Sequence, residues 1–299
     1  MHSIEELVGD RLLITSRRYW KYFEIDPTYS VLAKNQITED IARVIVDTLS
    51  EEQLARVRAH GVAGFGGGKV MDYAKCVYGE SLAPSLLLIP GTITTDAHLT
   101  NSYAIRDFCN KKIRYRVIPY GYETKVDPEL LSTIYKKEMG VSPTTWALSE
   151  LFSHFTSSWE AVHVLKKPDL GDTLKVLAEE MRALPEKDGS KEWFIALSAL
   201  FDFSLRIQDD FGVEYQEASE HYIAYYDEFV NGNSGPHGKL LANGIEFILT
   251  YQNNEYENLW HELKERYYLY SSPVKIDEIK MKKLLMENKF RKCLLEELL

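Results

Sequence analysis

The stretch GFGGGK at Gly64–Lys69 is the feature that most constrains how this chain can fold. It joins the apolar run GVAGF to KVMDYAKCVY, whose apolar positions have helical spacing. Such a junction exposes backbone N–H groups at the positive end of a helix, and glycine lets an anion approach them closely. The spacing matches neither GxGxxG nor the P-loop. The stretch predicts a phosphate-binding turn, with a tight turn that merely needs positive φ as the alternative.

The residues around this turn alternate between strand and helix patterns. Short apolar runs typical of strands are RLLIT, YSVLA, GVAGF and SLLLIP. A helix is expected in TEDIARVIVDTL, and Ser50 with Gln53 forms a capping-box pattern before another helix, which Gly61 ends. This βαβ order predicts a mostly parallel sheet with helices on both faces.

After Asp127 the pattern becomes helical only. Asp127 as N-cap and Pro128 at the first helical position start one helix, and Ser142–Pro143 starts the next. Further helices are expected over residues 173–184, 191–210, 216–229, 237–252, 255–270 and 276–299. The chain is therefore expected to form an α/β domain at 1–125 and an all-α domain at 126–299, with a ligand-binding cleft between them.

Charge and composition exclude several classes of protein. A formal net charge of −10 argues against nucleic acid or an anionic membrane as a partner. The three cysteines are far apart and give no disulfide or CxxC pattern. The chain has no apolar run of about 18 residues and its acidic start does not resemble a signal peptide. We expect a cytoplasmic protein, and the 19 tyrosines are compatible with a homo-oligomer.

Two motifs together resemble one family. GFGGGKVMDYAK resembles the GGG(S/K)xxDxAK motif of the dehydroquinate synthase-like superfamily, and LLLIPGTITTDAHLTNSYAI resembles its IPTTxSTDAxxS segment. That group includes glycerol dehydrogenase, sn-glycerol-1-phosphate dehydrogenase and the iron-containing alcohol dehydrogenases. The resemblance implies a dinucleotide-binding first domain and a helical metal- and substrate-binding second domain.

The resemblance also implies site residues. The glycines would receive the pyrophosphate of NAD or NADP, and the threonine-rich turn would line the nicotinamide. Matched by position, the cofactor-binding residues are Gly66, Gly67, Gly68, Lys69, Asp72, Thr92, Thr95 and Thr100. Asp96 would lie beside a small polyol or phosphorylated substrate. Read from the residues alone, Asp72 and Lys75 could instead be a solvated ion pair, and Asp96 could cap a helix starting at Ala97.

Two histidines match the metal ligands of the resembled family. His221 lies in ASEHYIAYYDEF and His237 in GPHGKLLANGIEF, which correspond to the family's (S)xEH and HGE segments. Both would hold a divalent ion such as zinc, iron or nickel, for which imidazole is a suitable ligand. Pro236–His237 also starts a helix, whose positive end favours a neutral imidazole.

The third ligand departs from the family pattern. Relatives carry an acid in G-x-G-D at a helix start, where this chain has Ser142 and Pro143. Glu150, almost two turns further along the expected helix, is a poor candidate, and Lys239 replaces the glutamate of HGE. The sequence therefore predicts a weakened metal site with His221 and His237 alone.

The segment before the glycine turn is short for this family. Only SRRYWKYFEIDPT separates RLLIT from YSVLA, which is too little for a full crossover helix. The aromatic side chains of Tyr19, Trp20, Tyr22 and Phe23 could stack on a base, but core packing is the favoured interpretation.

Three functions agree with these patterns. The first is an NAD(P)-dependent, metal-assisted dehydrogenase of a small polyol or polyol phosphate. The second is a lyase, cyclase or isomerase in which His221, His237 and Asp96 act as general acids and bases. The third is a non-catalytic binding or scaffold protein, against which the intact glycine turn argues.

Overall fold

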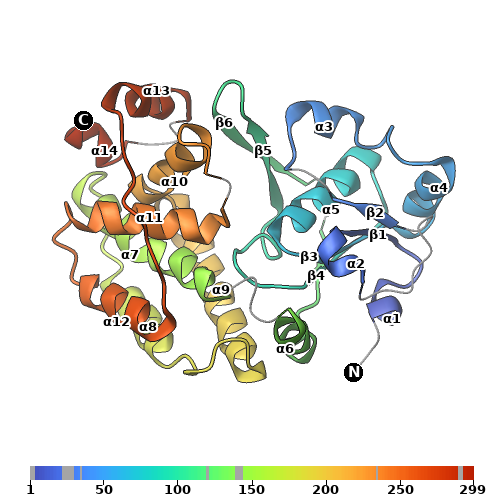
Figure 1. Ribbon diagram of the computed structural model, residues 1–299, viewed down its shortest axis with the longest axis horizontal. Coiled ribbons are helices and arrows are strands. Elements are labelled where there is room, and N and C mark those ends of the chain that lie inside the picture. The colour runs from blue at the N-terminus through green and yellow to red at the C-terminus, as the bar shows by residue number, and fades with distance from the viewer. Residues whose placement is uncertain are drawn as a thin grey trace. The chain divides into compact units, whose positions relative to one another are not determined.

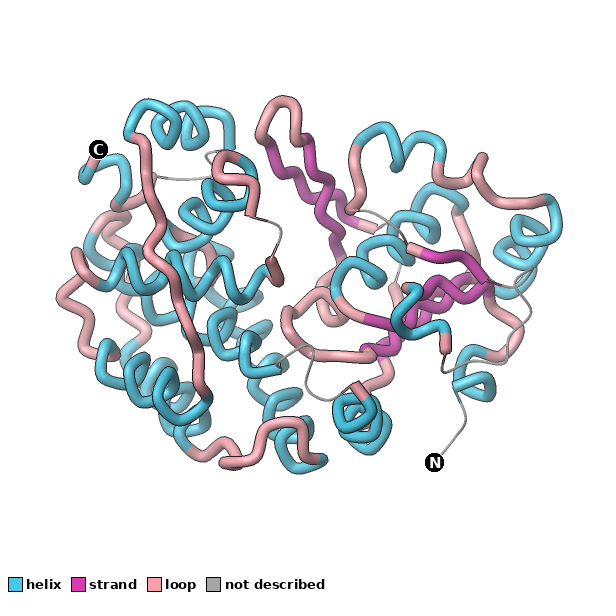
Figure 2. The backbone as a smooth tube through the Cα atoms, viewed as in Figure 1, coloured by secondary structure: helices cyan, strands magenta, loops and turns pink. Residues whose placement is uncertain are grey.

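The computed structural model describes residues 4–21, 30–33, 36–118, 121–138, 144–233, 235–288 and 292–299. Contacts divide the chain into two compact units, Met1–Ser142 and Pro143–Leu299. All strands of the described residues belong to the first unit, as the magenta segments of Figure 2 show. None of the helices in these residues is both long and apolar enough to cross a membrane.

The first unit is built on a five-stranded parallel sheet of order β2-β1-β3-β4-β7 (Figure 1). The strands are β1 (Leu12–Thr15), β2 (Ser30–Leu32), β3 (Val62–Gly66), β4 (Leu86–Pro90) and β7 (Glu123–Thr124). In the central register, Ile14 lies opposite Gly64 and Gly64 opposite Leu88. The predicted parallel sheet is confirmed.

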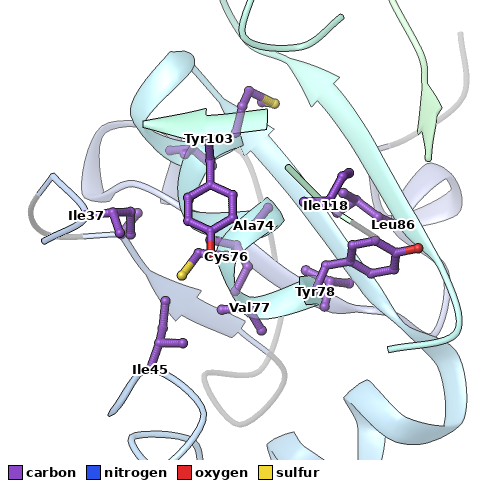
Figure 3. Close-up of a cluster of buried hydrophobic side chains, with 14 of the residues drawn as sticks. Ile37, Ile45, Ala74, Cys76, Val77, Tyr78, Leu86, Tyr103 and Ile118 are labelled. Atoms are coloured by element: carbon purple, nitrogen blue, oxygen red, sulfur yellow. The ribbon is translucent and has the colours of Figure 1, made fainter. Parts of the chain in front are cut away.

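Helices cover both faces of this sheet because neighbouring strand residues point in opposite directions. They are α1 (Ile4–Val8), α2 (Arg17–Trp20), α3 (Glu39–Val44), α4 (Glu51–His60), α5 (Gly68–Ser81) and α6 (Pro128–Lys137). On one face, Leu12, Ile14 and Leu88 pack against α3, α4 and α5. Figure 3 shows part of this cluster, with Ala74, Val77 and Tyr78 of α5 and Leu86 of β4. On the other face, Leu13, Phe65 and Ile89 pack with α1, Tyr19 and α6.

Local signals in the sequence explain several of these helix ends. Ser50 and Gln53 form the expected capping box, and Gly61 ends α4 with φ 94°. Asp127 accepts hydrogen bonds from Glu129 N and Leu130 N at the start of α6. Since α6 packs on the sheet, it belongs to the first unit, whereas the predicted domain division between residues 125 and 126 falls before it.

Two elements of the first unit differ from expectation. The helix expected in TEDIARVIVDTL is short, because α3 ends at Val44 and turns follow. An antiparallel hairpin of β5 (Ser102–Asp107) and β6 (Lys112–Val117) was not predicted. Its inward side chains Tyr103, Ile105 and Ile113 are buried, and Lys111 adopts φ 54° at the turn.

The second unit is all-helical, as predicted. Its helices are η2 (Thr144–Trp146), α7 (Ala147–His163), α8 (Gly171–Arg182), α9 (Lys191–Phe211), η3 (Val213–Tyr215), α10 (Ser219–Phe229), α11 (His237–Leu249), α12 (Glu257–Tyr267), α13 (Glu278–Asn288) and α14 (Leu295–Leu298). Helix α7 is buried around almost its whole circumference and contacts α9, α10, α11 and η3. Such a helix is the core of its unit.

Candidate functional site

The glycine turn joins β3 directly to α5. Gly66 is the last residue of β3, Gly67 is the N-cap and Gly68 is the first residue of α5. The first N–H groups of a helix have no carbonyl one turn earlier to bond, so this turn presents donors at a positive helix end. Lys69 is exposed in the first turn of α5. The turn has the backbone arrangement that an anion site needs.

The threonine-rich segment packs on this turn. Gly91 N donates to Gly66 O at 2.8 Å. A Cβ on Gly67 would lie 3.2 Å from Thr92 Cγ2, and one on Gly68 would lie 3.0 Å from Thr95 Oγ1. The glycine turn and the threonine-rich segment, separated by more than twenty residues in sequence, therefore form one structural element.

One polar atom of this element has no protein partner. Thr92 Oγ1 is buried and makes no hydrogen bond in the described part of the chain. A buried hydroxyl without a partner costs free energy unless a ligand or water satisfies it. The glycine turn and this hydroxyl together fit a dinucleotide, which carries phosphate oxygens and polar ring substituents.

Asp96 does not cap a helix. Residues 97–99 form a turn in which Leu99 N donates to Asp96 O, and Thr95 Oγ1 accepts from Ala97 N. The helix-cap interpretation of Asp96 is therefore wrong. Asp96 lies in the first unit, and its predicted place beside the substrate stays a prediction.

Lys75 is a buried anchor and not part of a solvated ion pair. It is 0% exposed, and its Nζ donates to Ala97 O at 2.6 Å, Ser102 O at 2.7 Å and Thr100 Oγ1 at 3.1 Å. Burial lowers the pKa of Lys75 to about 8. Burial likewise raises the pKa of Asp72 to about 6. Lys75 therefore fixes the threonine-rich segment to α5, and Thr100 is one of its acceptors.

Tyr19 lies beneath the glycine turn. It is buried, contacts Phe65 edge to face at 5.6 Å, and would lie within 3.0 Å of a Cβ on Gly91. Burial raises its pKa to about 12. Tyr19 therefore packs in the core, which was the favoured interpretation of the aromatic cluster. Tyr22 and Phe23 lie outside the described residues.

In the second unit, three helices bring together His221, His237 and Glu150. The two imidazole rings lie 5.7 Å apart between centroids. Glu150 Oε1 is 3.5 Å from His237 Nε2, and Glu150 Oε2 is 4.0 Å from His221 Nε2. One nitrogen or oxygen atom of each residue lies within 4.8 Å of the others.

Glu150 corrects the expectation that no acid accompanies the two histidines. The α-helix was expected to begin at Ser142–Pro143, which would put Glu150 two turns inside it. Instead, residues Thr144–Trp146 form a 3₁₀ turn and α7 begins at Ala147, so Glu150 lies in its first turn. An acid at a helix start is the feature that the family pattern requires. Ser142 and Pro143 themselves lie outside the described residues.

Close helix packing positions the two histidines. A Cβ on Gly244 of α11 would lie 2.2 Å from Glu220 O, and one on Gly238 would lie 2.3 Å from Trp146 O. These glycines let α11 contact the backbone of α10 and η2 directly. The ring of Tyr225 stacks on His237 at 6.2 Å with an interplanar angle of 23°.

The loop before His237 is also held in place. Asp227 Oδ1 accepts hydrogen bonds from Asn231 Nδ2 at 2.9 Å and Asn233 Nδ2 at 2.8 Å. Asp227 O accepts from Asn233 N at 3.0 Å. Because Asp227 is buried in α10, it fixes the loop on the helix that carries His221.

The surroundings of His221 favour positive charge. Burial by itself would lower its pKa, but the hydrogen bond to Glu220 and the nearby carboxylates outweigh burial and raise the pKa to about 9. Two imidazoles and one carboxylate are a common ligand set for zinc and for iron. The cluster therefore fits a divalent transition-metal ion in both donor type and charge.

Comparisons with known proteins agree with this architecture. No family model matches the sequence, and a sequence comparison with curated proteins gives no match. Solved structures do match. A probable glycerol dehydrogenase from Sinorhizobium meliloti 1021 aligns over 98% of this chain and 87% of its own, with a TM-score of 0.65 and 13% identity.

Two further structures connect the fold to different reactions. An iron-containing alcohol dehydrogenase from Thermotoga maritima aligns over 97% of this chain and 88% of its own, with a TM-score of 0.57 and 17% identity. The 2-epi-5-epi-valiolone synthase ValA from Streptomyces hygroscopicus subsp. jinggangensis 5008, with NAD⁺ and Zn²⁺ bound, aligns over 93% and 80%, with a TM-score of 0.59 and 14% identity. The chain therefore has the dehydroquinate synthase-like fold of the superfamily that includes the iron-containing alcohol dehydrogenases, as its two motifs predicted.

Proposed function

We propose that this protein is a metal-assisted, NAD(P)-dependent oxidoreductase that acts on a CH–OH group of a small polyol or polyol phosphate. The observation that carries the proposal is the buried cluster of Glu150, His221 and His237. It stands in a chain whose fold is shared with dehydrogenases of alcohols and glycerol.

Each unit would contribute one function. In the first unit, the N–H groups of Gly67 and Gly68 would bind the pyrophosphate, and Thr92 Oγ1 would gain a ligand partner. In the second unit, Glu150 and the Nε2 atoms of His221 and His237 would hold zinc, iron or nickel. The bound metal would supply a Lewis acid that polarises the substrate oxygen. Asp96 would orient substrate hydroxyls.

The first experiment is a zinc competition titration on the purified protein and on Glu150→Ala. We expect one tightly bound ion in the parent. In Glu150→Ala, the zinc affinity should fall by more than the roughly 10- to 100-fold that is typical when a residue hydrogen-bonded to a metal ligand is replaced. Glu257→Gln is the matched control, because Glu257 Oε1 also lies 3.6 Å from a histidine, His261, but both are exposed. A parent that binds no zinc, iron or nickel would overturn the metal proposal.

A second experiment separates this function from a non-redox reaction. ValA, a synthase solved with NAD⁺ and Zn²⁺, shares the fold, so a lyase, cyclase or isomerase that uses the same ligands is the second candidate. A panel of polyols and polyol phosphates would be incubated with NAD⁺ or NADP⁺, and reduced nicotinamide would be measured at 340 nm. Net formation of NADH or NADPH supports the oxidoreductase. Substrate conversion without net reduced cofactor supports the second candidate.

A further inference from the structure

The second unit contains a buried carboxylate beside the cluster that the sequence did not identify. Glu220 precedes His221 at the start of α10 and is 0% exposed. Its Oε1 lies 2.9 Å from His221 Nδ1. Because an ionised carboxylate can only accept hydrogen bonds, Nδ1 is the donor and carries the proton. In the neutral imidazole that a metal ion requires, the other ring nitrogen, Nε2, is then the atom with a lone pair, and it faces Glu150.

The position of Glu220 is fixed independently of His221. Oε1 accepts hydrogen bonds from Ser157 Oγ and Ala218 N, both at 2.8 Å, and Oε2 accepts from Thr156 Oγ1 at 3.1 Å. Every one of these contacts is a donor pointing at the carboxylate. Glu220 also lies in the first turn of α10, where the helix dipole favours negative charge. The site therefore holds an ionised carboxylate in one orientation.

We propose that Glu220 is a positioning residue for the metal centre, which orients His221 and balances the charge of the bound ion. A divalent ion held by one ionised carboxylate, Glu150, and two neutral imidazoles keeps one net positive charge. Since an uncompensated buried charge is unfavourable, a second ionised carboxylate one imidazole away from the ion offsets it. This inference rests on the proposed metal site.

A second buried carboxylate provides the contrast. Glu160 of α7 is also 0% exposed, and it accepts hydrogen bonds from Ser219 Oγ at 3.0 Å and Leu294 N at 2.9 Å. These contacts join α7 to α10 and to the C-terminal residues. They describe a structural role for Glu160, whereas the hydrogen bond of Glu220 reaches His221 of the cluster.

The decisive variant is Glu220→Gln. The amide is close in shape, and its oxygen can keep the contacts to Ser157, Ala218 and His221, so the main loss is the negative charge. We expect the zinc affinity to fall roughly 10- to 100-fold in a competition titration, whereas Glu160→Gln should stay within about twofold of the parent. Unfolding of both variants would be followed by circular dichroism, because each loses one buried charge.

A second variant, Glu220→Leu, removes the acceptor as well. We expect a still lower zinc affinity, and loss of the Nδ1–H form of His221 in ¹⁵N NMR spectra of the imidazoles. Glu220→Gln should retain that form. An unchanged zinc affinity in folded Glu220→Gln would overturn the inference, and so would equal losses in Glu220→Gln and Glu160→Gln. A parent without zinc binding would instead reject the proposed metal site itself.

Discussion

Glycine excludes a side chain for different reasons in the glycine turn of the first unit and around the Glu150, His221 and His237 cluster of the second unit. At Gly67 and Gly68, an added Cβ would meet side-chain atoms, of which the nearest are Thr92 Cγ2 at 3.2 Å and Thr95 Oγ1 at 3.0 Å. At Gly238 and Gly244, it would meet backbone carbonyl oxygens at 2.3 and 2.2 Å. Side-chain ends can shift, whereas a helix backbone cannot shift without moving the helix.

This difference separates two ways of building a site. In the first unit, the main chain itself is the proposed binding group, so glycine keeps it accessible. In the second unit, side chains from three helices are the proposed ligands, and glycine brings those helices close enough for the ligands to meet. Replacing a glycine should therefore mainly weaken cofactor binding in the first unit and mainly reduce folding stability in the second.

The largest expected effect is that of Gly244→Ala. In an ordinary helix this change stabilises by up to about 1 kcal/mol. Here the added methyl group would overlap Glu220 O, so we expect a loss of about 3 kcal/mol or more. Denaturant unfolding followed by tryptophan fluorescence would measure it, since four of the five tryptophans lie in the second unit.

Gly235→Ala is the control for this substitution. Gly235 lies just before α11, and its nearest atoms to an added Cβ are 3.8 Å away. A Cβ there makes ordinary contacts, so the free energy of unfolding should change by less than about 0.5 kcal/mol. If Gly244→Ala were as stable as this control, the helices would not be in backbone contact.

Lys75→Met should have the next largest effect. Methionine fills similar volume but leaves Ala97 O and Ser102 O without their donor in a buried setting. We expect a loss of about 2 to 3 kcal/mol and faster hydrogen exchange in residues 97–102. Lys136→Met, at an exposed position of α6, should change neither quantity. An unaltered exchange rate in Lys75→Met would show that another contact holds this segment.

The sequence predicted the first unit well where the signal was local. The capping box at Ser50, the N-cap at Asp127 and the apolar strands each depend on residues close together in the chain. The hairpin of β5 and β6 was missed although Tyr103, Ile105 and Ile113 have the alternation of a strand. Its turn spans residues 108–111 and contains no glycine, so the usual turn signal is absent.

The cluster of Glu150, His221 and His237 was predicted only in part, for a physical reason. His221 and His237 follow from motif positions, but Glu150 depends on where α7 begins. A 3₁₀ turn at Thr144–Trp146 delays the α-helix and moves Glu150 to its first turn. Helix ends are the least certain part of a prediction from sequence. A candidate ligand that is identified by counting from a helix start can therefore be misplaced by the same few residues. Glu220 gave a signal, the EH pair itself, but its contact with His221 required coordinates.

A smaller, pH-dependent effect is expected at His98 in the first unit. Burial and the charge of Lys75 lower the pKa of His98 to about 4 from an ordinary value of 6.5. Between these values the unfolded chain binds the proton and the folded chain does not, so stability falls as the pH falls from about 6.5 to 4. From pH 7 to 5 the loss is about 2 kcal/mol.

His98→Phe isolates this effect, because the phenylalanine side chain does not titrate. Hydrogen exchange in β3 and β4 would give the free energy of opening of the first unit at both pH values. The difference between parent and variant should change by about 2 kcal/mol between pH 7 and 5. A difference that is the same at both pH values would mean that His98 protonates without cost in the folded state.

The smallest effect on folding, and the sharpest test of the comparison between the two units, is Gly67→Ala. Its backbone angles, φ −90° and ψ −175°, are allowed for alanine, and the Cβ needs Thr92 to yield by only a few tenths of an ångström. We expect a loss of stability below about 1 kcal/mol. The same methyl group would stand between the proposed pyrophosphate and the N–H groups of the turn, so NADH affinity measured by fluorescence titration should fall about tenfold or more.

Gly121→Ala, where nothing lies within 4 Å of the added Cβ, should leave both quantities unchanged. If Gly67→Ala bound NADH as the parent does, Gly67 would serve packing alone. It would then differ from Gly244 only in how much stability its replacement costs.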